Sequence, residues 1–235
     1  MKTAIIVQAR MGSTRLPGKI MKKILDRPMI EFLLKRISKS EMTDDIIVAT
    51  SDREENKKLI NFLKLKKIKY FIGDENDVLS RYYNAAKKYN INNIVRVTAD
   101  CPLIDPTIID STIKTYLNDN VDYTSNIFPR SFPKGFDTEV FSFNSLEKAF
   151  NETSCLYDRE HVTPYIRESG KFNISNYSYD KNYSNLRLTV DWKEDFELID
   201  KIFNLFKPNI HFNWLDVIDE LYRNPELIKI NSHLN

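Results

Sequence analysis

Residues 3–9 (T-A-I-I-V-Q-A) and the loop after them, residues 10–19 (R-M-G-S-T-R-L-P-G-K), decide the fold. The first run is apolar and lacks polar alternation, which is typical of a strand buried on both faces of a parallel sheet. Residues 46–50 and 94–98 have the same character. The sequence therefore predicts several buried parallel strands, of which residues 3–9 form the first.

Helical patterns lie between these strands. Residues 30–37 and 78–86 place apolar side chains at the i, i+3, i+4, i+7 spacing of a helix, and a third helix begins at Glu54 behind Ser51 and Asp52 as caps. A strand at residues 69–72 follows the third helix. Alternation at this spacing predicts an α/β fold with a doubly wound, mostly parallel sheet, which binds ligands beyond the carboxyl ends of its strands.

The alternation of strand and helix patterns stops after about residue 120. Residues 135–143 (GFDTEVFSF) alternate, which predicts a strand with Asp137 and Glu139 on a face that lines a cleft. Further elements are expected over four segments: strands at 172–179 and 186–190, and helices at 194–206 and 214–222. No linker marks a boundary, so we expect a single domain over residues 1–235, whose second half, 121–235, builds the other side of the cleft.

Composition narrows the possible partners. Hydrophobic residues make up 42% of the chain and the formal net charge is +2, so the chain folds and carries no global charge for nucleic acid or an acidic membrane. Cys101 and Cys155 are too few for a disulfide framework or a zinc cluster. The apolar opening is too short for a signal peptide or a membrane span. We expect a cytoplasmic protein.

Residues 9–19 carry the strongest chemical signal. Three cations, two glycines and two hydroxyls lie between a buried strand and a helix, where backbone N–H groups and side-chain charges can wrap a polyphosphate. A Walker loop is disfavoured because five residues separate Gly12 from Gly18 and Ile20 follows Lys19. A dinucleotide-binding fold is disfavoured because no G-x-G-x-x-G spacing occurs.

Several motifs in order resemble one family. The loop A-R-M-G-S-T-R-L-P-G-K is similar to that of the cytidylyltransferases of the acylneuraminate and deoxy-octulosonate type, most closely the spore coat polysaccharide branch. The other matching segments are D-V-L-S-R (77–81), R-V-T-A-D-C-P-L (96–103), residues 133–141, R-E-H-V-T-P (159–164) and L-T-V-D (188–191). The resemblance implies a Rossmann-like fold of the nucleotide-diphospho-sugar transferase type, with residues 1–120 as its nucleotide-binding half.

The resemblance also implies roles for the loop. Contacts to the CTP phosphates are expected from five of its residues, namely Arg10, Gly12, Ser13, Arg15 and Lys19. The backbone near Ala9 and the Arg81 segment would lie near the base and ribose. Arg15, Lys19 and Asp100 would be the catalytic residues.

Two aspartates are candidates for holding Mg²⁺. Asp100 follows a buried strand and would lie beside the phosphate loop, where a carboxylate can hold Mg²⁺ against the α-phosphate. Asp191 ends another strand; its alternative role is the N-cap of the next helix, in a capping box with Glu194. The resemblance favours Asp191 as the second metal ligand. Ala99 departs from the glycine that relatives often carry before the metal aspartate.

Acceptor-site residues are expected in the second half. Glu139 would stand on the cleft wall, although a solvated strand face is equally consistent with its pattern. Arg159 and His161 are placed at the acceptor pocket, where Arg159 would bind an anionic group, against the alternative that His161 is a structural hydrogen-bonding residue.

The sequence is interpreted as an enzyme that uses CTP and Mg²⁺ to convert an anionic sugar or related acid into its CMP derivative, releasing pyrophosphate, for surface polysaccharide biosynthesis. Two alternatives stay open: a nucleotidyltransferase of the same fold that uses another NTP, and a sugar-nucleotide-binding module without turnover. Relatives commonly form dimers, so a homodimer is expected, with no nucleic acid and no membrane as partner.

Overall fold

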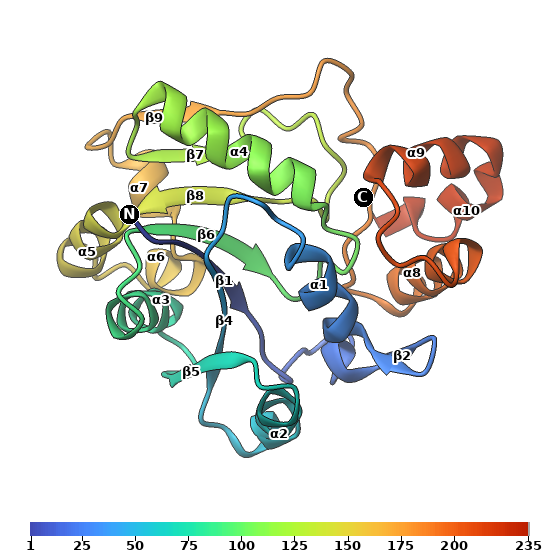
Figure 1. The fold of residues 1–235 in the computed structure, drawn as a ribbon, viewed down its shortest axis with the longest axis horizontal. Helices are drawn as coiled ribbons and strands as arrows, with labels where there is room; N and C mark the ends of the chain where they lie inside the picture. The colour runs from blue at the N-terminus through green and yellow to red at the C-terminus, as the bar shows by residue number, and fades with distance from the viewer. Residues whose placement is uncertain (235) are drawn as a thin grey trace.

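Seven strands form one sheet in a computed structural model of the chain, which describes residues 1–234. They are β1 (Thr3–Gln8), β4 (Asp45–Ser51), β5 (Lys69–Gly73), β6 (Asn93–Thr98), β7 (Tyr123–Ser125), β8 (Glu139–Ser142) and β9 (Ile174–Asn176). Their order across the sheet is β5-β4-β1-β6-β8-β7-β9 (Figure 1). Only β8 runs antiparallel to its neighbours, β6 and β7. The prediction of a mostly parallel sheet is therefore confirmed.

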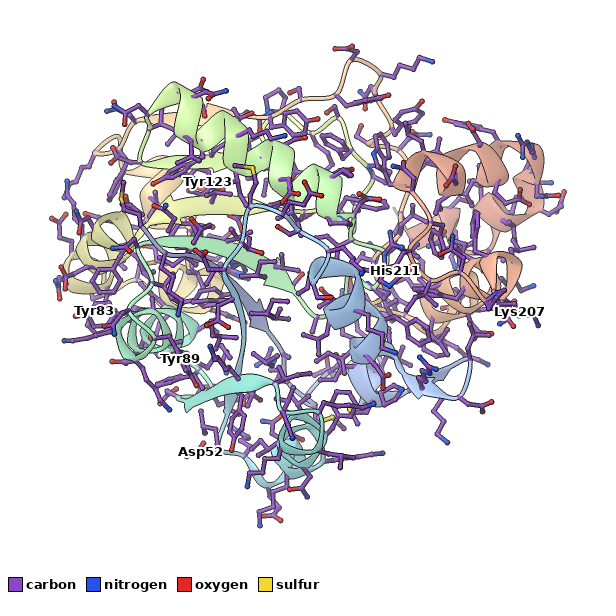
Figure 2. The ribbon with its side chains drawn as sticks, in the orientation of Figure 1. Asp52, Tyr83, Tyr89, Tyr123, Lys207 and His211 are labelled. Carbon is purple, nitrogen blue, oxygen red and sulfur yellow. The ribbon has the colours of Figure 1, made fainter. Side chains whose placement is uncertain are left out.

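Helices cover both faces of the sheet. They are α1 (Met29–Ile37), α2 (Lys57–Leu65), α3 (Val78–Lys88), α4 (Pro106–Asp119), α5 (Phe143–Glu152), α6 (Leu156–His161), α7 (Pro164–Glu168), α8 (Lys193–Phe206), α9 (Trp214–Arg223) and α10 (Pro225–Lys229). Apolar side chains of α1, α2, α4, α8 and α9 share one core, and those of α3, α5 and α7 share the other. Figure 2 draws the side chains on this ribbon, with Tyr83 on α3 among those labelled.

Short elements complete the chain. They are the hairpin strands β2 (Lys23–Ile24) and β3 (Arg27–Pro28) and the 3₁₀ turns η1 (Lys19–Met21), η2 (Glu54–Asn56) and η3 (Ser232–Leu234). None of the helices within residues 1–234 is long and apolar enough to cross a membrane.

Strand β1 is buried because both of its faces are covered. Residues 4–7 are 0% exposed, and β1 pairs in parallel with β4 on one side and β6 on the other. A continuous apolar run is what such a central strand requires. This arrangement brings the carboxyl ends of β1, β4 and β6 to one edge of the sheet, and the loop after β1 starts there.

The helix after β4 begins differently from the prediction. Ser51 is the last residue of β4, and Asp52 is exposed at the carboxyl end of that strand (Figure 2). The helix opens at Glu54 as the 3₁₀ turn η2 without a side-chain cap. The Ser51 hydroxyl instead donates to the carboxylate of Glu75.

Strand β8 is shorter than the predicted strand over residues 135–143. Asp137 precedes β8 and pairs with Arg130, with nitrogen–oxygen distances of 2.6 and 2.8 Å. At the other end, the Ser142 hydroxyl accepts from the backbone N–H of Ser145 at 2.9 Å and caps α5. That cap ends the strand one residue before Phe143.

Residues 186–190 do not form the predicted strand; Arg187 alone makes an isolated bridge, to Lys134. Their alternate residues Leu186, Leu188 and Val190 are buried, as the pattern indicated. The Leu188 N–H donates to Lys134 O at 2.7 Å, and the Val190 N–H donates to Asp100 O at 2.8 Å. The segment bonds two different parts of the chain, so no continuous ladder forms.

Candidate active site

A cavity of about 800 Å³ opens at the carboxyl ends of β1, β4 and β6. Of the residues predicted from the sequence, eight line it: Arg10, Gly12, Ser13, Arg15, Lys19, Asp100, His161 and Asp191. Four others, Ala9, Arg81, Glu139 and Arg159, are not among its lining residues. The three cations of the loop and the two aspartates predicted to hold a metal therefore line the same cavity.

Hydrogen bonds within and behind the loop set its shape. The Gly18 N–H donates to Met11 O at 3.1 Å, and Gly18 has a φ of 67°, a left-handed conformation that glycine adopts without strain. The Met11 N–H donates to the side-chain oxygen of Asn56 at 2.7 Å, and Asn56 is fully buried. Asn56 therefore ties the loop to the end of β4, a role that the sequence pattern did not reveal.

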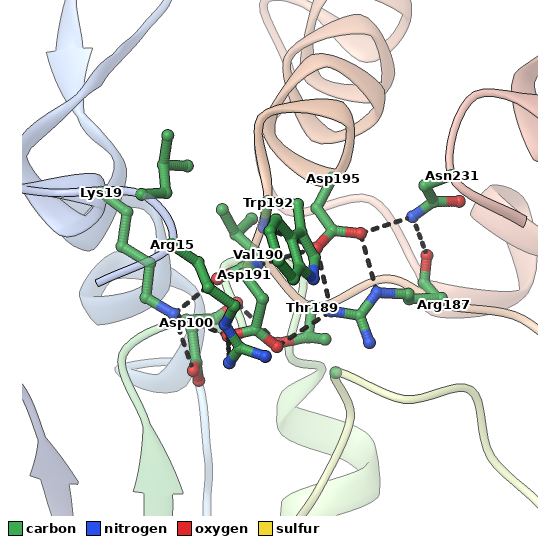
Figure 3. A network of polar contacts seen from close by, with 12 residues as sticks. Arg15, Lys19, Asp100, Arg187, Thr189, Val190, Asp191, Trp192, Asp195 and Asn231 are labelled. Atoms are coloured by element: carbon green, nitrogen blue, oxygen red, sulfur yellow. Dashed lines mark hydrogen bonds and ion pairs between the residues drawn. The ribbon is translucent and has the colours of Figure 1, made fainter. Parts of the chain in front are cut away.

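The ammonium of Lys19 lies between the two aspartates (Figure 3). Its Nζ donates to Asp100 Oδ2 at 3.2 Å, to Asp191 Oδ1 at 3.0 Å and to the backbone oxygen of Val190 at 2.7 Å. Burial disfavours the charged form of Lys19, but the two carboxylates outweigh it and raise its pKa. Two carboxylates thus converge on one cation beside the loop of residues 10–19.

Asp191 is surrounded by cations. Its Oδ1 accepts from Arg15 Nη2 at 2.9 Å, and its Oδ2 accepts from Arg187 Nη2 at 2.9 Å. Burial opposes ionisation of Asp191, yet the neighbouring cations, Lys19 foremost, lower its pKa. The Arg15 guanidinium also lies 5.4 Å from the centroid of the Trp192 ring.

Helix α8 has Trp192 as its N-cap, and Asp195, at the third helical position, supplies the carboxylate of the capping box. The Asp195 carboxylate accepts from the backbone N–H groups of Asp191 and Trp192 at 2.8 and 2.9 Å. It also binds Arg187 and the Asn231 amide, each at 2.9 Å or closer (Figure 3). The predicted capping box of Asp191 with Glu194 is therefore wrong, because the helix starts one residue later and Trp192 and Asp195 hold the two capping positions. The Asp191 carboxylate is left to face the cavity.

The carboxylates of Asp100 and Asp191 fit a small divalent cation. Both already hold one cation between them, and carboxylate oxygens are ligands that Mg²⁺ prefers. Within residues 1–234, no group of three or more His, Cys, Asp and Glu side chains could hold a metal ion. A bound Mg²⁺ would therefore keep water or phosphate oxygens as its other ligands.

The far wall beside β5 carries Glu75, a charge that the sequence pattern did not point to. Glu75 Oε1 accepts from Arg10 Nη1 at 2.9 Å, which positions the first cation of the loop. Arg81 is 1% exposed, and its three guanidinium nitrogens have no hydrogen-bond partner among residues 1–234. Burial lowers its pKa, while the charges of Glu75 and Asp74 oppose that effect.

Two of the predicted acceptor-site residues have other partners. Arg159 Nη2 lies 2.8 Å from Asp77 Oδ2, and its Nη1 donates to Phe150 O at 2.8 Å. Glu139 is 2% exposed and pairs with Arg96. Neither faces the cavity, because β8 lies one strand beyond β6 and α6 turns Arg159 toward α3. His161, at the end of α6, is exposed and does line the cavity.

Comparison with known proteins places this arrangement in a family. The family model described as "Cytidylyltransferase" matches residues 4–220. An uncharacterized protein of Methanocaldococcus jannaschii is 39% identical over 240 residues, covering 100% of this chain and 96% of the relative. The spore coat polysaccharide biosynthesis protein SpsF of Bacillus subtilis is 29% identical over 238 residues, covering 94% of each chain.

Solved structures agree with that placement. A cytidylyltransferase from Leptospira borgpetersenii superposes with a TM-score of 0.92 at 37% identity, over 97% of both chains. A CMP:2-keto-3-deoxy-manno-octonic acid synthetase complexed with CTP shares the fold, with a TM-score of 0.70 at 15% identity over 87% of this chain and 99% of its own. This chain therefore belongs to the cytidylyltransferase family.

Proposed function

We propose that this enzyme transfers CMP from CTP to an oxygen nucleophile of an anionic acceptor and releases pyrophosphate. The observation that carries the proposal is the meeting of Arg15 and Lys19 with Asp100 and Asp191 at the mouth of one cavity. In this reaction the acceptor oxygen forms a bond to the α-phosphorus while the bond to the pyrophosphate oxygen breaks. Positioning and charge neutralisation supply most of the catalysis in phosphoryl and nucleotidyl transfer.

The loop residues would neutralise the triphosphate. Arg15, with a side chain 49% exposed, and Lys19 can donate to the oxygens of the leaving pyrophosphate. Arg10, Gly12 and Ser13 would contact the same phosphates. The backbone near Ala9 and the buried Arg81 stay our candidates for the base and ribose side, and the unpartnered guanidinium of Arg81 supports a polar partner there.

Asp100 and Asp191 would hold Mg²⁺. When bound, the ion would polarise the α-phosphate and orient it for attack. The convergence of the two carboxylates supports this assignment. Arg187 orients Asp191 from behind, and Asp195 orients Arg187.

The relatives support an acid sugar as the acceptor. The 3-deoxy-manno-octulosonate cytidylyltransferase of Bdellovibrio bacteriovorus is 28% identical over 195 residues, covering 78% of this chain. SpsF takes its name from polysaccharide biosynthesis. Of the acceptor residues expected from the sequence, His161 retains a place on the cavity wall. We therefore propose a role in making a surface polysaccharide or glycan.

Pyrophosphate release tests the proposal. The enzyme is mixed with Mg²⁺, each of CTP, UTP and ATP, and each of a set of sugar acids and neutral sugars. Release with CTP and an acid alone is the expected result. Equal release with UTP would instead support a nucleotidyltransferase of broader base use, and release with a neutral sugar would contradict the anionic acceptor.

We also propose a homodimer. The supporting observation is a set of exposed apolar side chains on α6 and β9, with Leu156 85%, Tyr157 56% and Ile174 52% exposed. Edge strand β9 also pairs with β7 alone. Light scattering of the purified chain, compared with a Leu156→Glu variant, measures the oligomeric state.

A further inference from the structure

The cavity has three sectors, and two of them have occupants in the proposed function. The loop with Asp100 and Asp191 suits the phosphates, and the wall at the ends of β4 and β5 suits the nucleoside. The third sector lies at the ends of β1 and β6 and beside α6. It is lined by Gln8, Arg96, Thr98, Glu160 and His161. By elimination, the acceptor occupies this third sector.

Arg96 lies on the floor of this sector. Gln8 on β1 and Thr98 on β6 are register partners, and Arg96 is two residues before Thr98, on the same face of the sheet. The Arg96 side chain is 16% exposed, and it is the one arginine among the lining residues of the sector. A guanidinium there can donate to two oxygens of a carboxylate at once.

Arg96 is held rigidly from behind. Its Nη1 donates to Glu139 Oε2, and its Nη2 donates to Gln8 Oε1 at 3.3 Å. Glu139 accepts further from the Tyr123 hydroxyl at 2.7 Å and the Thr163 hydroxyl at 2.6 Å. A guanidinium fixed in this way loses little conformational entropy when it binds a ligand.

The ion pair of Arg96 and Glu139 is oriented with Arg96 toward the cavity. The Glu139 side chain is 3% exposed and is not a lining residue, whereas Arg96 is. Arg96 Nε is buried and has no hydrogen-bond partner among residues 1–234. Arg167 approaches Glu139 at 3.9 Å, so the carboxylate is shared between two guanidinium groups. The sector therefore presents a fixed, positively charged guanidinium to the cavity.

We infer that Arg96 binds the acidic group of the acceptor and that Glu139 is its positioning residue. The inference rests on the proposed function for the identity of the acceptor site. It assigns to Arg96 the task that the sequence analysis gave to Arg159, whose guanidinium is engaged by Asp77 and Phe150. It also gives Glu139 a role in the acceptor site that acts through Arg96.

The test measures binding without turnover. Eight- and nine-carbon 3-deoxy-2-keto sugar acids, and the C1 amide of each, are titrated calorimetrically into enzyme saturated with CTP in EDTA. Arg96→Gln should weaken acid binding about 10- to 150-fold, the range for losing a charged hydrogen-bond partner, and should leave amide binding within about threefold. Arg96→Lys should be intermediate.

Two controls separate recognition from folding. CTP affinity should stay near wild type in Arg96→Gln and in Arg223→Gln, which removes an exposed arginine far along the chain. The thermal midpoint should stay near wild type in Arg223→Gln but fall in Arg96→Gln, which leaves the buried Glu139 carboxylate without its ion-pair partner, so binding is measured below that midpoint. Glu139→Gln should reproduce the loss of preference for acid over amide; if it does not fold, Arg96→Lys still carries the test. Equal acid binding by wild type and Arg96→Gln overturns the inference, and so does a wild-type enzyme that binds none of the acids.

The proposed function fails by a different result. If Arg96→Gln loses acid binding but wild-type enzyme with Mg²⁺ releases no pyrophosphate, the inference stands and the proposed reaction does not. If pyrophosphate is released with an acid that Arg96→Gln binds as well as wild type, the reaction stands and Arg96 is not its acceptor ligand.

Discussion

Replacing Lys19 with methionine removes the cation at the centre of the site while keeping a side chain of similar length. The Nζ of Lys19 makes contacts of 3.2, 2.7 and 3.0 Å to Asp100, Val190 and Asp191. The Lys19 side chain is 12% exposed, and a methionine of similar length can fill the same space. The variant therefore changes charge with little change of shape.

Lys19→Met should lower kcat much more than it lowers the free energy of unfolding. A preorganised cation that stabilises a developing anion contributes about 3 to 4 kcal/mol to the transition state, so kcat should fall roughly 100- to 1000-fold. The cost in folding free energy should be about 1 kcal/mol or less, because Asp191 keeps Arg15 and Arg187 at 2.9 Å and the site is partly exposed.

Pyrophosphate release and urea unfolding measure the two effects. Lys22→Met is the matched control, since Lys22 is exposed and lies outside the cavity lining. It should retain wild-type turnover and stability. A Lys19→Met enzyme with kcat within threefold of wild type would refute the role of Lys19 at the phosphates, and a loss of several kcal/mol in stability would show that Lys19 is mainly structural.

Asp191→Asn should abolish turnover and weaken Mn²⁺ binding at least about tenfold, as measured by electron paramagnetic resonance. Unchanged Mn²⁺ affinity would leave Asp100 as the only protein ligand of the metal. Asp195→Ala should lower the free energy of unfolding by about 3 to 5 kcal/mol, because it leaves the buried Arg187 without its main partner. The Asp195 carboxyl has a pKa below the usual 3.8, so its contribution to stability is present above that value and is lost as pH falls through the lowered pKa; urea midpoints of wild type between pH 6 and pH 2 should fall more steeply than those of Asp195→Ala. CTP should raise the thermal midpoint by several degrees more than UTP does, because a site built for an exocyclic amine leaves its buried partners unpaired with uracil; equal shifts would contradict selective recognition of cytosine.

Local sequence patterns were sufficient for much of the first half of the fold. The apolar runs at β1, β4 and β6 needed no knowledge of distant contacts, because a strand buried on both faces must be apolar throughout. The same held for the loop of residues 10–19 and for Asp100, since each directly follows such a strand. Their place at the carboxyl edge follows from the parallel topology.

Long-range partners decided the rest. Asp191 and Glu194 fit a local capping-box pattern. Only the folded chain shows that α8 starts one residue later, with Trp192 and Asp195 in the capping box and with Arg187 and Asn231 bound to Asp195. Asp191 then meets Lys19 across 172 residues of chain. In the sequence, Arg96 is part of a strand motif and Arg159 is a cation with no evident partner. In the folded chain, β8 brings Glu139 against Arg96, and α6 directs Arg159 toward Asp77. A sequence pattern reports which face of its own element a charged residue occupies, but the partner that fixes its charge comes from another element, and only the folded chain brings the two together.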